Sequence, residues 1–564
     1  MREIKQGSIS TNIENVTQGT ISSLAYQAST TTPSSQLPYS NPNLEEWILS
    51  KLTQGCYQLS LNRLDTLSME YLEGHPNLLI FKAAAMLFSN YHADTIRQIL
   101  IYAEKFITDE NMQGEILALQ SKTEIHHGHI NVGIQLSHIA HSKIRKDNIF
   151  FRKLIERNLG IAYTIKGDLR NAVIWFENLL LSGFKVRNYS DILASYHYLA
   201  YIHRIQGQLR IANVIYRKAL IFINQNQLHK NPFSIKVIAG YGHLLLQRHD
   251  IDDAIRHLDQ AIRLAEMTNV LYAQNAYQSL SEAFIRKNEI NKAFTVLKQY
   301  HDHIGKTEDR YYRRHSEHVL AIEARINLEA GRIDQAYKWV LSRGFTHPPS
   351  NTHQINFHYE LGYSLPVAAR IYIAKNMPNQ AIDLLSPVIP KFSHQGANSF
   401  LIRALNALAI AYYQTGDSLK AKIILNKAIR LGQSEDNLGD FIFLGKQLLP
   451  LLKEVLKNST ANEFSMKLIS IINNMKDIEY DRYTTGEDTI SLSHREMDVL
   501  HLLSKGLTNQ EIAKNLFLSA NTIKSHTIKI YRKLNVHNRK RAVRKAHLLG
   551  LLPNKAIHIH QQSA

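Results

Sequence analysis

The chain has 564 residues, of which 44% are hydrophobic and 20% charged, so we expect a mostly globular protein of two or more domains. A single cysteine excludes an intramolecular disulfide, which is typical of a reducing cytoplasm. The N-terminus lacks the apolar stretch of a signal peptide, and the most apolar window, 78–88, is too short to span a bilayer. We therefore expect a cytoplasmic protein that does not enter the membrane.

The net charge of +18 is concentrated at one end of the chain. Residues 491–564 contain 13 Lys/Arg and 3 Asp/Glu, a net charge of +10, whereas all the preceding residues together contribute +8. A local excess of positive charge of this kind indicates a nucleic-acid-binding surface rather than a generally basic protein.

Ser, Thr, Asn and Gln dominate residues 7–43, which also contain three prolines. Such a segment cannot bury enough apolar surface to offset the entropy lost on ordering. We expect residues 1–43 to form a disordered polar segment, and helical periodicity to begin near Leu44.

Residues 44–455 contain an internal repeat of about 41 residues. Each unit has a small residue at its centre and a bulky residue four positions later, and Gly133 continues the pattern one unit towards the N-terminus. The small residues are Ala172, Ala212, Ala254, Ala293, Ala336, Ala381 and Ala421. The bulky residues are Phe176, Tyr216, Leu258, Leu297, Val340, Leu385 and Leu425.

Each repeat is predicted to be a helical hairpin. The small residue lets the second helix approach the first, and the bulky residue packs against the next unit. Gly167-Asp168 and Gly416-Asp417 are predicted to end one helix and cap the next, with Gly207 and Gly331 at the same place in their units. The pattern resembles stretched tetratricopeptide (TPR) repeats and, by its length, the superhelical sensor domain of the MalT-like family.

This resemblance would also imply an N-terminal ATPase, whose phosphate loop needs the pattern G-x-x-x-x-G-K-[ST]. The nearest segment, Gly305-Lys306-Thr307, has Tyr300 at the upstream glycine position and lies within the repeats. We therefore expect a regulator that lacks the ATPase and binds no nucleotide or other cofactor.

Residues 456–490 are expected to contain one further amphipathic helix, over 462–478, and a polar linker. Residues 491–553 then show the signals of a four-helix domain, followed by a tail over 554–564. Ser493 and Glu496 form one capping box, Thr508 and Glu511 form a second, and Ser519 is placed to cap a third helix that runs to Leu534. A short connection between the second and third helices is typical of a helix-turn-helix.

The same segment resembles the LuxR-type helix-turn-helix family at many spaced positions, and this resemblance implies DNA binding. The matching residues are Ser493-x-Arg495-Glu496-x-x-Val499-Leu500, Gly506-x-Thr508-Asn509-x-Glu511-Ile512-Ala513, Leu518-Ser519-x-x-Thr522-Ile523-Lys524-x-His526, Lys533-Leu534-x-Val536, Arg539 and Ala542-Val543. The fold class predicted for the whole chain is therefore all-α: a TPR-like solenoid followed by a LuxR-type domain.

The third helix divides into two faces by its periodicity. Ile523, Thr527, Ile530 and Leu534 are expected to face the core. The opposite stripe is expected to enter the major groove of DNA, with Lys524, Ser525 and Ile528 near base edges and Lys529 and Arg532 near phosphates.

Other residues of the two helices complete the predicted DNA-binding set. Asn509 and Gln510 are candidates for phosphate contacts, whereas capping alone explains Thr508. Asn521 and Thr522 lie at the start of the third helix, and His526 is included although we favour a packed, hydrogen-bonded role for it at the turn.

The fourth helix is expected to start near Asn538 and to carry a basic face, with apolar residues on its other side. The basic residues are Arg539, Lys540, Arg541, Arg544 and Lys545, and the apolar ones are Ala542, Val543, Ala546 and Leu549. The family resemblance implies dimerisation through this helix. The alternative, that it only completes the core, stays open.

No catalytic or metal-binding pattern accompanies these motifs. His126-His127-Gly128-His129 is the densest histidine cluster, but it fits a turn between helices and lacks a second cluster at zinc-ligand spacing. We therefore expect neither an enzyme nor a metalloprotein.

The predicted function is regulation of transcription. The expected partners are double-stranded DNA bound by a homodimer, RNA polymerase, and a small-molecule or protein effector on the solenoid, with no membrane contact. The resemblance implies an activator, although repression stays open. The alternative is a TPR-like interaction scaffold whose helix-turn-helix does not bind DNA, and the intact basic stripe on the third helix argues against it.

Overall fold

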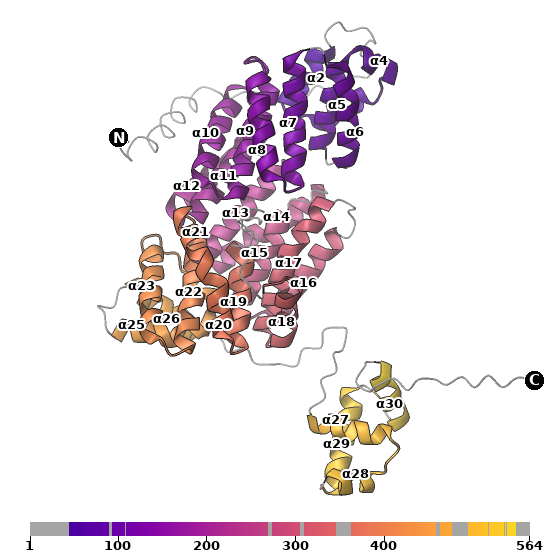
Figure 1. Cartoon of the computed structure of the whole chain (residues 1–564), viewed down its shortest axis with the longest axis vertical. Coiled ribbons are helices and arrows are strands. Elements are labelled where there is room, and N and C mark those ends of the chain that lie inside the picture. The colour runs from indigo at the N-terminus through magenta and orange to yellow at the C-terminus, as the bar shows by residue number, and fades with distance from the viewer. Residues whose placement is uncertain are drawn as a thin grey trace, which may run out of the picture.

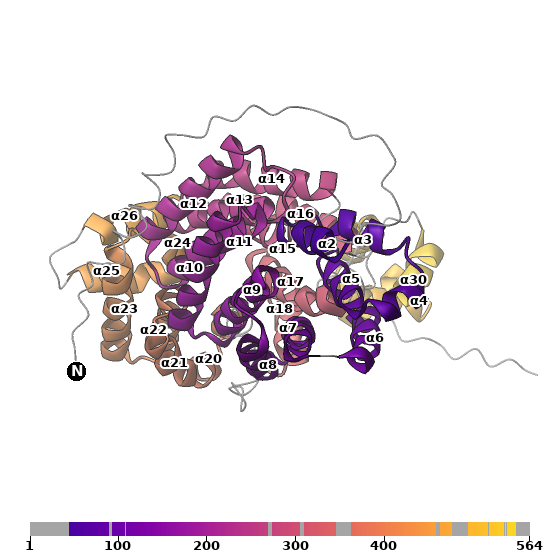
Figure 2. The same ribbon diagram turned by 90° about the horizontal axis from the view of Figure 1, so that it is seen from above.

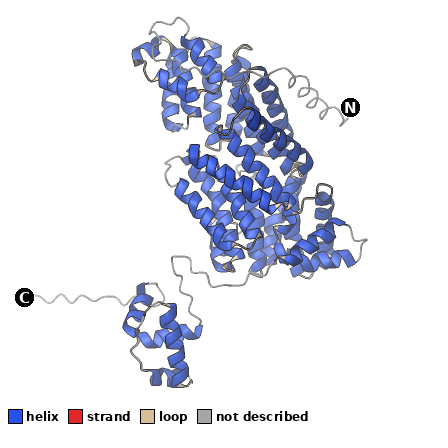
Figure 3. Ribbon diagram, turned by 180° about the vertical axis from the view of Figure 1, so that it is seen from behind, coloured by secondary structure: helices blue, strands red, loops and turns tan. Residues whose placement is uncertain are grey.

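The computed structural model describes residues 44–89, 93–107, 109–268, 273–304, 310–345, 362–457, 463–475, 494–516, 518–534, 536 and 538–548. Every regular element in these ranges is a helix, which confirms the predicted all-α class (Figures 1 and 3). The expected disordered segment 1–43, the linker after residue 475 and the tail 554–564 lie outside these ranges. Within them, no helix is both long and apolar enough to cross a membrane.

The helices that precede the regular repeats pack around α5, most of whose side chains are buried. Its sequence is apolar on every side, so neighbours cover it all round. The helices of this part are α2 (Leu44–Thr53), α3 (Tyr57–Leu64), α4 (Met69–Gly74), α5 (Pro76–Phe88), α6 (Ala93–Ala103) and the short 3₁₀ helix η1 (Glu104–Phe106).

Antiparallel helical hairpins follow, as predicted. The pairs are α7 (Glu110–His126) with α8 (Ile130–Lys143), α9 (Ile149–Lys166) with α10 (Leu169–Lys185), α11 (Tyr189–Ile205) with α12 (Leu209–Gln225), α13 (Pro232–Arg248) with α14 (Ile251–Thr268), α15 (Gln274–Arg286) with α16 (Ile290–Ile304), α17 (Arg310–Glu329) with α18 (Ile333–Ser342), α19 (Leu365–Ala374) with α20 (Pro378–Leu385), and α22 (Asn398–Gln414) with α23 (Ser418–Gln433).

The residues that define the sequence repeat are buried on the second helix of each hairpin. All seven predicted alanines are on the second helix and are fully buried, and the bulky residues four positions later are at most 3% exposed. Gly133 takes the place of the alanine on α8, where an added Cβ would lie 2.4 Å from Cγ1 of Ile125. A larger side chain at any of these positions would push the helices apart.

The Gly-Asp turns have the predicted geometry. Gly167 adopts a left-handed conformation with φ of 82°, and Asp168 accepts a hydrogen bond from the amide of Asn171 at 3.3 Å. In the last hairpin Gly416 has φ of 89°, and Asp417 accepts from the amide of Lys420 at 3.0 Å. One residue therefore ends the first helix and the next caps the second.

One insertion and one C-terminal extension depart from the hairpin pattern of the described residues. A 3₁₀ helix, η4 (Ser386–Val388), and α21 (Ile389–His394) are inserted before α22. After α23 the chain forms α24 (Gly439–Ile442), η5 (Gly445–Leu448), α25 (Leu449–Lys457) and α26 (Glu463–Asn474), the last of which was expected from the sequence. Figure 2 shows the helices from α7 to α26 wound about a common centre.

The superhelix winds tightly enough for distant repeats to touch. Helix α11 contacts α22, and α13 contacts α24. Asn398 Nδ2 donates to the carbonyl of Gln206 at 3.0 Å, and the amide of Arg210 donates to Glu435 Oε2 at 2.9 Å. The first helices of the central hairpins therefore face the interior of the superhelix.

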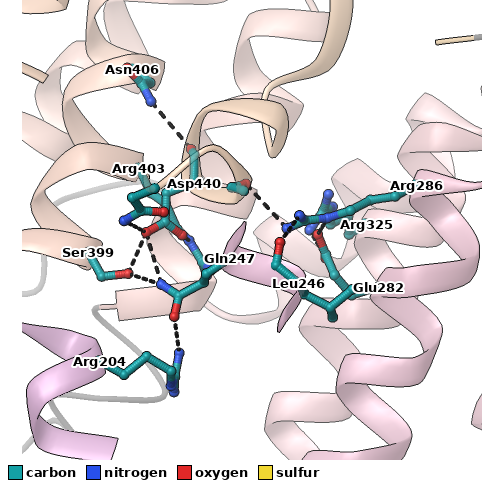
Figure 4. A network of polar contacts seen from close by, with 12 residues as sticks. Arg204, Leu246, Gln247, Glu282, Arg286, Arg325, Ser399, Arg403, Asn406 and Asp440 are labelled. Carbon is teal, nitrogen blue, oxygen red and sulfur yellow. Dashed lines mark hydrogen bonds and ion pairs between the residues drawn. The ribbon is translucent and has the colours of Figure 1, made fainter. Parts of the chain in front are cut away.

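A buried polar network, which we call the central network, fills this interior (Figure 4). Asp440 is fully buried and accepts hydrogen bonds from Arg403 Nε at 2.5 Å, Ser399 Oγ at 2.5 Å and Gln247 Nε2 at 3.1 Å. Nearby, Glu282 pairs with Arg286 at 2.8 Å and with Arg325. Arg286, Arg325 and Arg403 thus each have a carboxylate partner, whereas Arg204 donates to Gln247 Oε1 at 3.1 Å.

The helices after the linker form a separate small core (Figure 1, yellow). They are α27 (His494–Ser504), α28 (Asn509–Leu516), α29 (Ala520–Lys533) and α30 (Arg539–Leu548). The core consists of the fully or nearly fully buried side chains Val499, Leu500, Leu503, Ile512, Ala513, Ile523, Ile530, Leu534, Ala542 and Ala546.

Candidate nucleic-acid interface

The turn that leads into α28 is held by the predicted capping box. Glu511 Oε2 accepts from the backbone amide of Thr508 at 2.7 Å and from its hydroxyl at 2.8 Å. The amide of Glu511 in turn donates to Thr508 Oγ1 at 3.4 Å. These bonds to the charged form lower the pKa of Glu511. Thr508 therefore has the capping role that its position indicated.

Helix α29 begins and ends as predicted. Ser519 accepts from the amide of Thr522 at 3.0 Å and caps the helix, and Leu534 follows its last residue. Ile523, Thr527, Ile530 and Leu534 are buried, so the face assigned to the core lies there.

The opposite face of α29 is exposed along its whole length. Lys524, Ser525, Ile528, Lys529 and Arg532 are all exposed, and Ile528 presents 58% of its surface to solvent. No Asp or Glu occurs anywhere in α29. This stripe can therefore offer cationic donors and one apolar contact to a ligand without first breaking an ion pair within its own helix.

The remaining predicted residues lie around the start of the two helices. Gln510 and Asn521 are exposed, whereas Asn509 and Thr522 are partly buried. The hydroxyl of Thr522 lies 2.7 Å from that of Ser519 and so takes part in the cap.

His526 departs from expectation. It lies in the middle of α29, partly buried, rather than at the turn. Its Nδ1 is buried and makes no hydrogen bond to the described residues, so the expected hydrogen-bonded role was wrong for this nitrogen. Its packing, by contrast, agrees with the expectation.

Two contacts that the motifs did not indicate join α29 and α30 to α27. Lys533 Nζ donates to the buried carboxylate of Glu496 on α27, and Arg539 donates to the carbonyl of Leu503 through Nη2 at 2.6 Å. Ser493, the predicted capping partner of Glu496, lies outside the described residues. The paired residues are 36 or 37 positions apart, so local sequence patterns cannot predict these contacts.

Helix α30 starts where predicted, with Asn538 Oδ1 accepting from the amide of Arg541 at 2.9 Å. Ala542 and Ala546 are buried against α27 and α29. Arg541 is exposed, while the side chains of Lys540, Arg544 and Lys545 lie outside the described ones. The helix thus completes the core, and its predicted role in dimerisation stays a prediction.

The histidine cluster lies at a turn, as the sequence indicated. Helix α7 ends at His126, and Gly128 adopts a left-handed φ of 86° before α8 begins. His129 Nδ1 lies 2.6 Å from a carboxylate oxygen of Glu124. The described residues contain no group of three or more potential ligands arranged to hold a metal ion.

Comparison with known families matches both parts of the chain. Residues 114–458 match the MalT-like TPR region, and residues 490–546 match the luxR family of bacterial regulatory proteins. Among solved structures, a Rap protein complexed with competence and sporulation factor aligns with 70% of this chain and 95% of its own, at 11% identity and a TM-score of 0.43.

Two curated relatives carry the same name. The chain is 21% identical over 535 residues to the HTH-type transcriptional regulator MalT of Vibrio cholerae, covering 90% of this chain and 58% of that protein. It is 23% identical to the MalT regulator of Vibrio parahaemolyticus, covering 86% of this chain and 55% of that protein. The chain thus spans a little over half the length of these relatives. The chain belongs to the MalT-like TPR family and carries a LuxR-family domain over residues 490–546.

Proposed function

We propose that α29 reads a promoter sequence from the major groove of double-stranded DNA. The observation that carries this proposal is the exposed stripe of α29, which is cationic, free of carboxylates and interrupted only by Ser525 and Ile528. An α-helix fits the major groove, and the second helix of a helix-turn-helix is the one that enters it.

The proposed roles follow from position along the helix. Lys524, near the N-terminal end, donates to the edge of a guanine, Ser525 bonds to a neighbouring base, and Ile528 contacts a thymine methyl group. Lys529 and Arg532, farther along, bind phosphates together with Asn509 and Gln510 at the start of α28. Asn521, Thr522 and Thr508 lie at the edges of this surface, and His526 supports it by packing.

The proposal assigns signal reception to residues 44–455 and DNA binding to residues 491–553, with 456–490 as the connection. An effector that binds one state of the solenoid more tightly shifts the population towards that state. In the proposed active state two copies bind one site as a homodimer and contact RNA polymerase, so that transcription is activated. The named role of the relatives as transcriptional regulators supports this division.

Mapping of bound sites across the genome, combined with transcript levels in a deletion strain, tests this function. We expect a shared sequence motif upstream of a small set of genes whose transcripts fall on deletion. The purified full chain should prefer a duplex with this motif over a scrambled duplex of equal length. Equal affinity for the two duplexes would contradict sequence-specific binding, and transcripts that rise on deletion would contradict activation.

A further inference from the structure

The exposed faces of α10 and α12 carry apolar side chains at matching positions of two consecutive hairpins. Ile174 and Val214 lie two positions after the buried alanine of their repeats. Leu181 and Ile221 lie nine positions after the same alanine. All four side chains are between 48% and 54% exposed. We call these four residues the apolar surface.

The two helices that carry the apolar surface lie side by side. The ring centroids of Phe184 on α10 and Phe222 on α12 are 5.9 Å apart, in an edge-to-face contact. Phe184 lies one turn after Leu181, and Phe222 directly follows Ile221, so this contact joins the helices at one end of the apolar surface. On each helix the two apolar positions are seven residues apart, which is about two turns, and they therefore share one face. The four side chains thus form one patch across two helices.

The repeat architecture does not require apolar residues at these positions. On α14 and α16 the equivalent residues are all exposed and polar, namely Arg256, Arg263, Thr295 and Asp302. On α23 the first position is Ile423, but the second is Arg430. A single exposed apolar side chain is ordinary, whereas a contiguous exposed group marks an interaction site. The apolar surface therefore has a role other than packing of the solenoid.

Positive charge accompanies the apolar surface on the same two faces. On α12, Arg217 and Lys218 lie between the two apolar positions, and on α10, Arg170 and Lys185 lie one turn before and one turn after them. None of these four cations forms an ion pair or a side-chain hydrogen bond with a described residue. Of the two helices only α10 contains a carboxylate, Glu177, and burial raises the pKa of this group. The charge available to a partner on this patch is therefore positive.

This charge distinguishes between the possible occupants of the apolar surface. In a two-fold contact a second copy of the chain would place the same patch, with the same cations, against this one. Like charges that face each other across an interface oppose association. A partner with carboxylates beside its apolar residues would instead gain both the apolar contact and the ion pairs. The observed pattern therefore favours an acidic partner over a second copy.

We propose that the apolar surface binds an amphipathic helix of another protein, whose apolar stripe is flanked by Asp or Glu. Such a helix presents apolar side chains at spacings of three, four and seven residues, which match two rows of positions seven residues apart. Its carboxylates pair with the four cations beside the apolar surface. The inference adds a protein partner on the exposed side of the hairpins, and it stands independently of how α29 binds DNA.

Fluorescence anisotropy of a labelled model peptide, titrated with the full chain, tests the apolar surface. The peptide has leucines at spacings of three, four and seven and glutamates beside them, and a matched peptide has lysines in place of the glutamates. We expect saturable binding of the acidic peptide, weakened by added salt, and much weaker binding of the basic peptide. Equal binding of the two peptides, or no binding of the acidic one, would overturn the proposal.

Removal of apolar side chains tests whether the peptide binds at this patch. Leu181→Ser combined with Ile221→Ser should lower the affinity for the acidic peptide at least about tenfold, because two apolar side chains lose their burial in the contact. Leu419→Ser combined with Ile423→Ser, on the exposed face of α23, is the matched control and should bind as the wild type does. Both variants should melt near the wild-type temperature, because all four side chains are exposed. Unchanged affinity in the first variant would overturn the proposal.

Reversal of charge tests the acidic character of the partner. Arg217→Glu combined with Lys218→Glu should weaken binding of the acidic peptide and strengthen binding of the basic peptide. A variant that keeps the wild-type preference would show that these cations do not select the partner, and the proposal of an acidic helix would fall.

Two further measurements address the other occupants. Sedimentation velocity of the full chain without DNA detects self-association, and co-sedimentation with phosphatidylglycerol vesicles detects membrane binding. We expect the variant with Leu181→Ser and Ile221→Ser to behave as the wild type does in both. Self-association or vesicle binding that this variant loses would assign the apolar surface to a second copy or to a membrane, and would overturn the proposal.

Discussion

The repeat region and the LuxR-family domain use positive charge in opposite ways. In the central network of the repeats, arginines such as Arg325 and Arg403 are almost fully buried and contact the carboxylates of Glu282 and Asp440. On α29, Lys524, Lys529 and Arg532 are exposed, and the helix contains no carboxylate. Buried charge needs a partner, whereas exposed charge is stable in water without one.

This difference separates the residues that maintain the fold from those that contact DNA. Removing a partner in the central network should reduce the free energy of unfolding of the repeats and leave DNA recognition intact in the folded protein. Removing a cation from the stripe of α29 should weaken DNA recognition and leave the free energy of unfolding unchanged.

The largest effect is expected from Asp440→Ala. The substitution leaves Arg403 buried without its carboxylate and removes the acceptor of Ser399 and Gln247. We expect a loss of about 3–5 kcal/mol in the free energy of unfolding, measured by urea denaturation of the full chain. Asp334→Ala, which removes an exposed partner of Lys375, is the control and should change the free energy of unfolding far less. Equal effects of the two changes would break the contrast between buried and exposed charge.

The second largest effect is expected from acid, which should weaken the central network. Burial alone would raise the pKa of Glu282, but Arg325, Arg286 and Arg403 outweigh it and hold this pKa at about 2. Because the folded pKa lies below the unfolded value, the stabilisation is present above about pH 4.5 and is lost as the pH falls towards 2.

We expect urea denaturation between pH 5 and pH 2 to show this loss, which amounts to about 3 kcal/mol when complete. Glu282→Gln should be less stable than the wild type at pH 5 and should lack this part of the acid dependence. If the variant and the wild type show the same pH dependence, groups other than Glu282 cause the loss of stability in acid.

Recognition of DNA should depend on Lys524. Lys524→Ala removes a proposed contact to a base edge, which contributes about 1–3 kcal/mol of discrimination. We expect specific binding to weaken far more than binding to random duplex, while the melting temperature stays near that of the wild type because the side chain is exposed. An unchanged ratio of specific to random affinity would show that this end of α29 does not read bases.

The smallest effect concerns Arg532, on the same stripe but farther along α29. If the domain neutralises about 4–6 phosphates, log K should fall with log salt at about −0.9 per contact. Arg532→Ala should weaken specific and random binding alike and reduce this slope by about one unit. Fluorescence titrations at two or more salt concentrations measure the slope, and a variant with the wild-type slope would place Arg532 away from the phosphates.

Local sequence patterns predicted most of the fold. Buried alanines such as Ala172 and Ala421 recur once in each hairpin, and the Gly-Asp turns need particular backbone conformations, so both leave a periodic signal. The capping box of Thr508 and Glu511 and the two faces of α29 were likewise predictable, because all their contacts lie within a few residues.

Long-range pairing could not be predicted in the same way. Gln247 and Asp440 are separated by 193 positions, and each looks like an ordinary polar residue of a helical repeat. The contacts of Lys533 with Glu496 and of Arg539 with Leu503 also join separate helices. The unpaired Nδ1 of His526 depends on how α29 packs, which the motif does not specify.

The contacts between distant repeats have a consequence for how the chain folds. An open array touches only its neighbours and can lose its units one at a time. Here Asn398 is bonded to Gln206 across 192 positions, so a long loop must close before these bonds can form. The repeat region should therefore unfold in one cooperative transition and refold more slowly than an open array of equal length. Deleting α24 to α26 should in turn loosen α13, far upstream in the sequence.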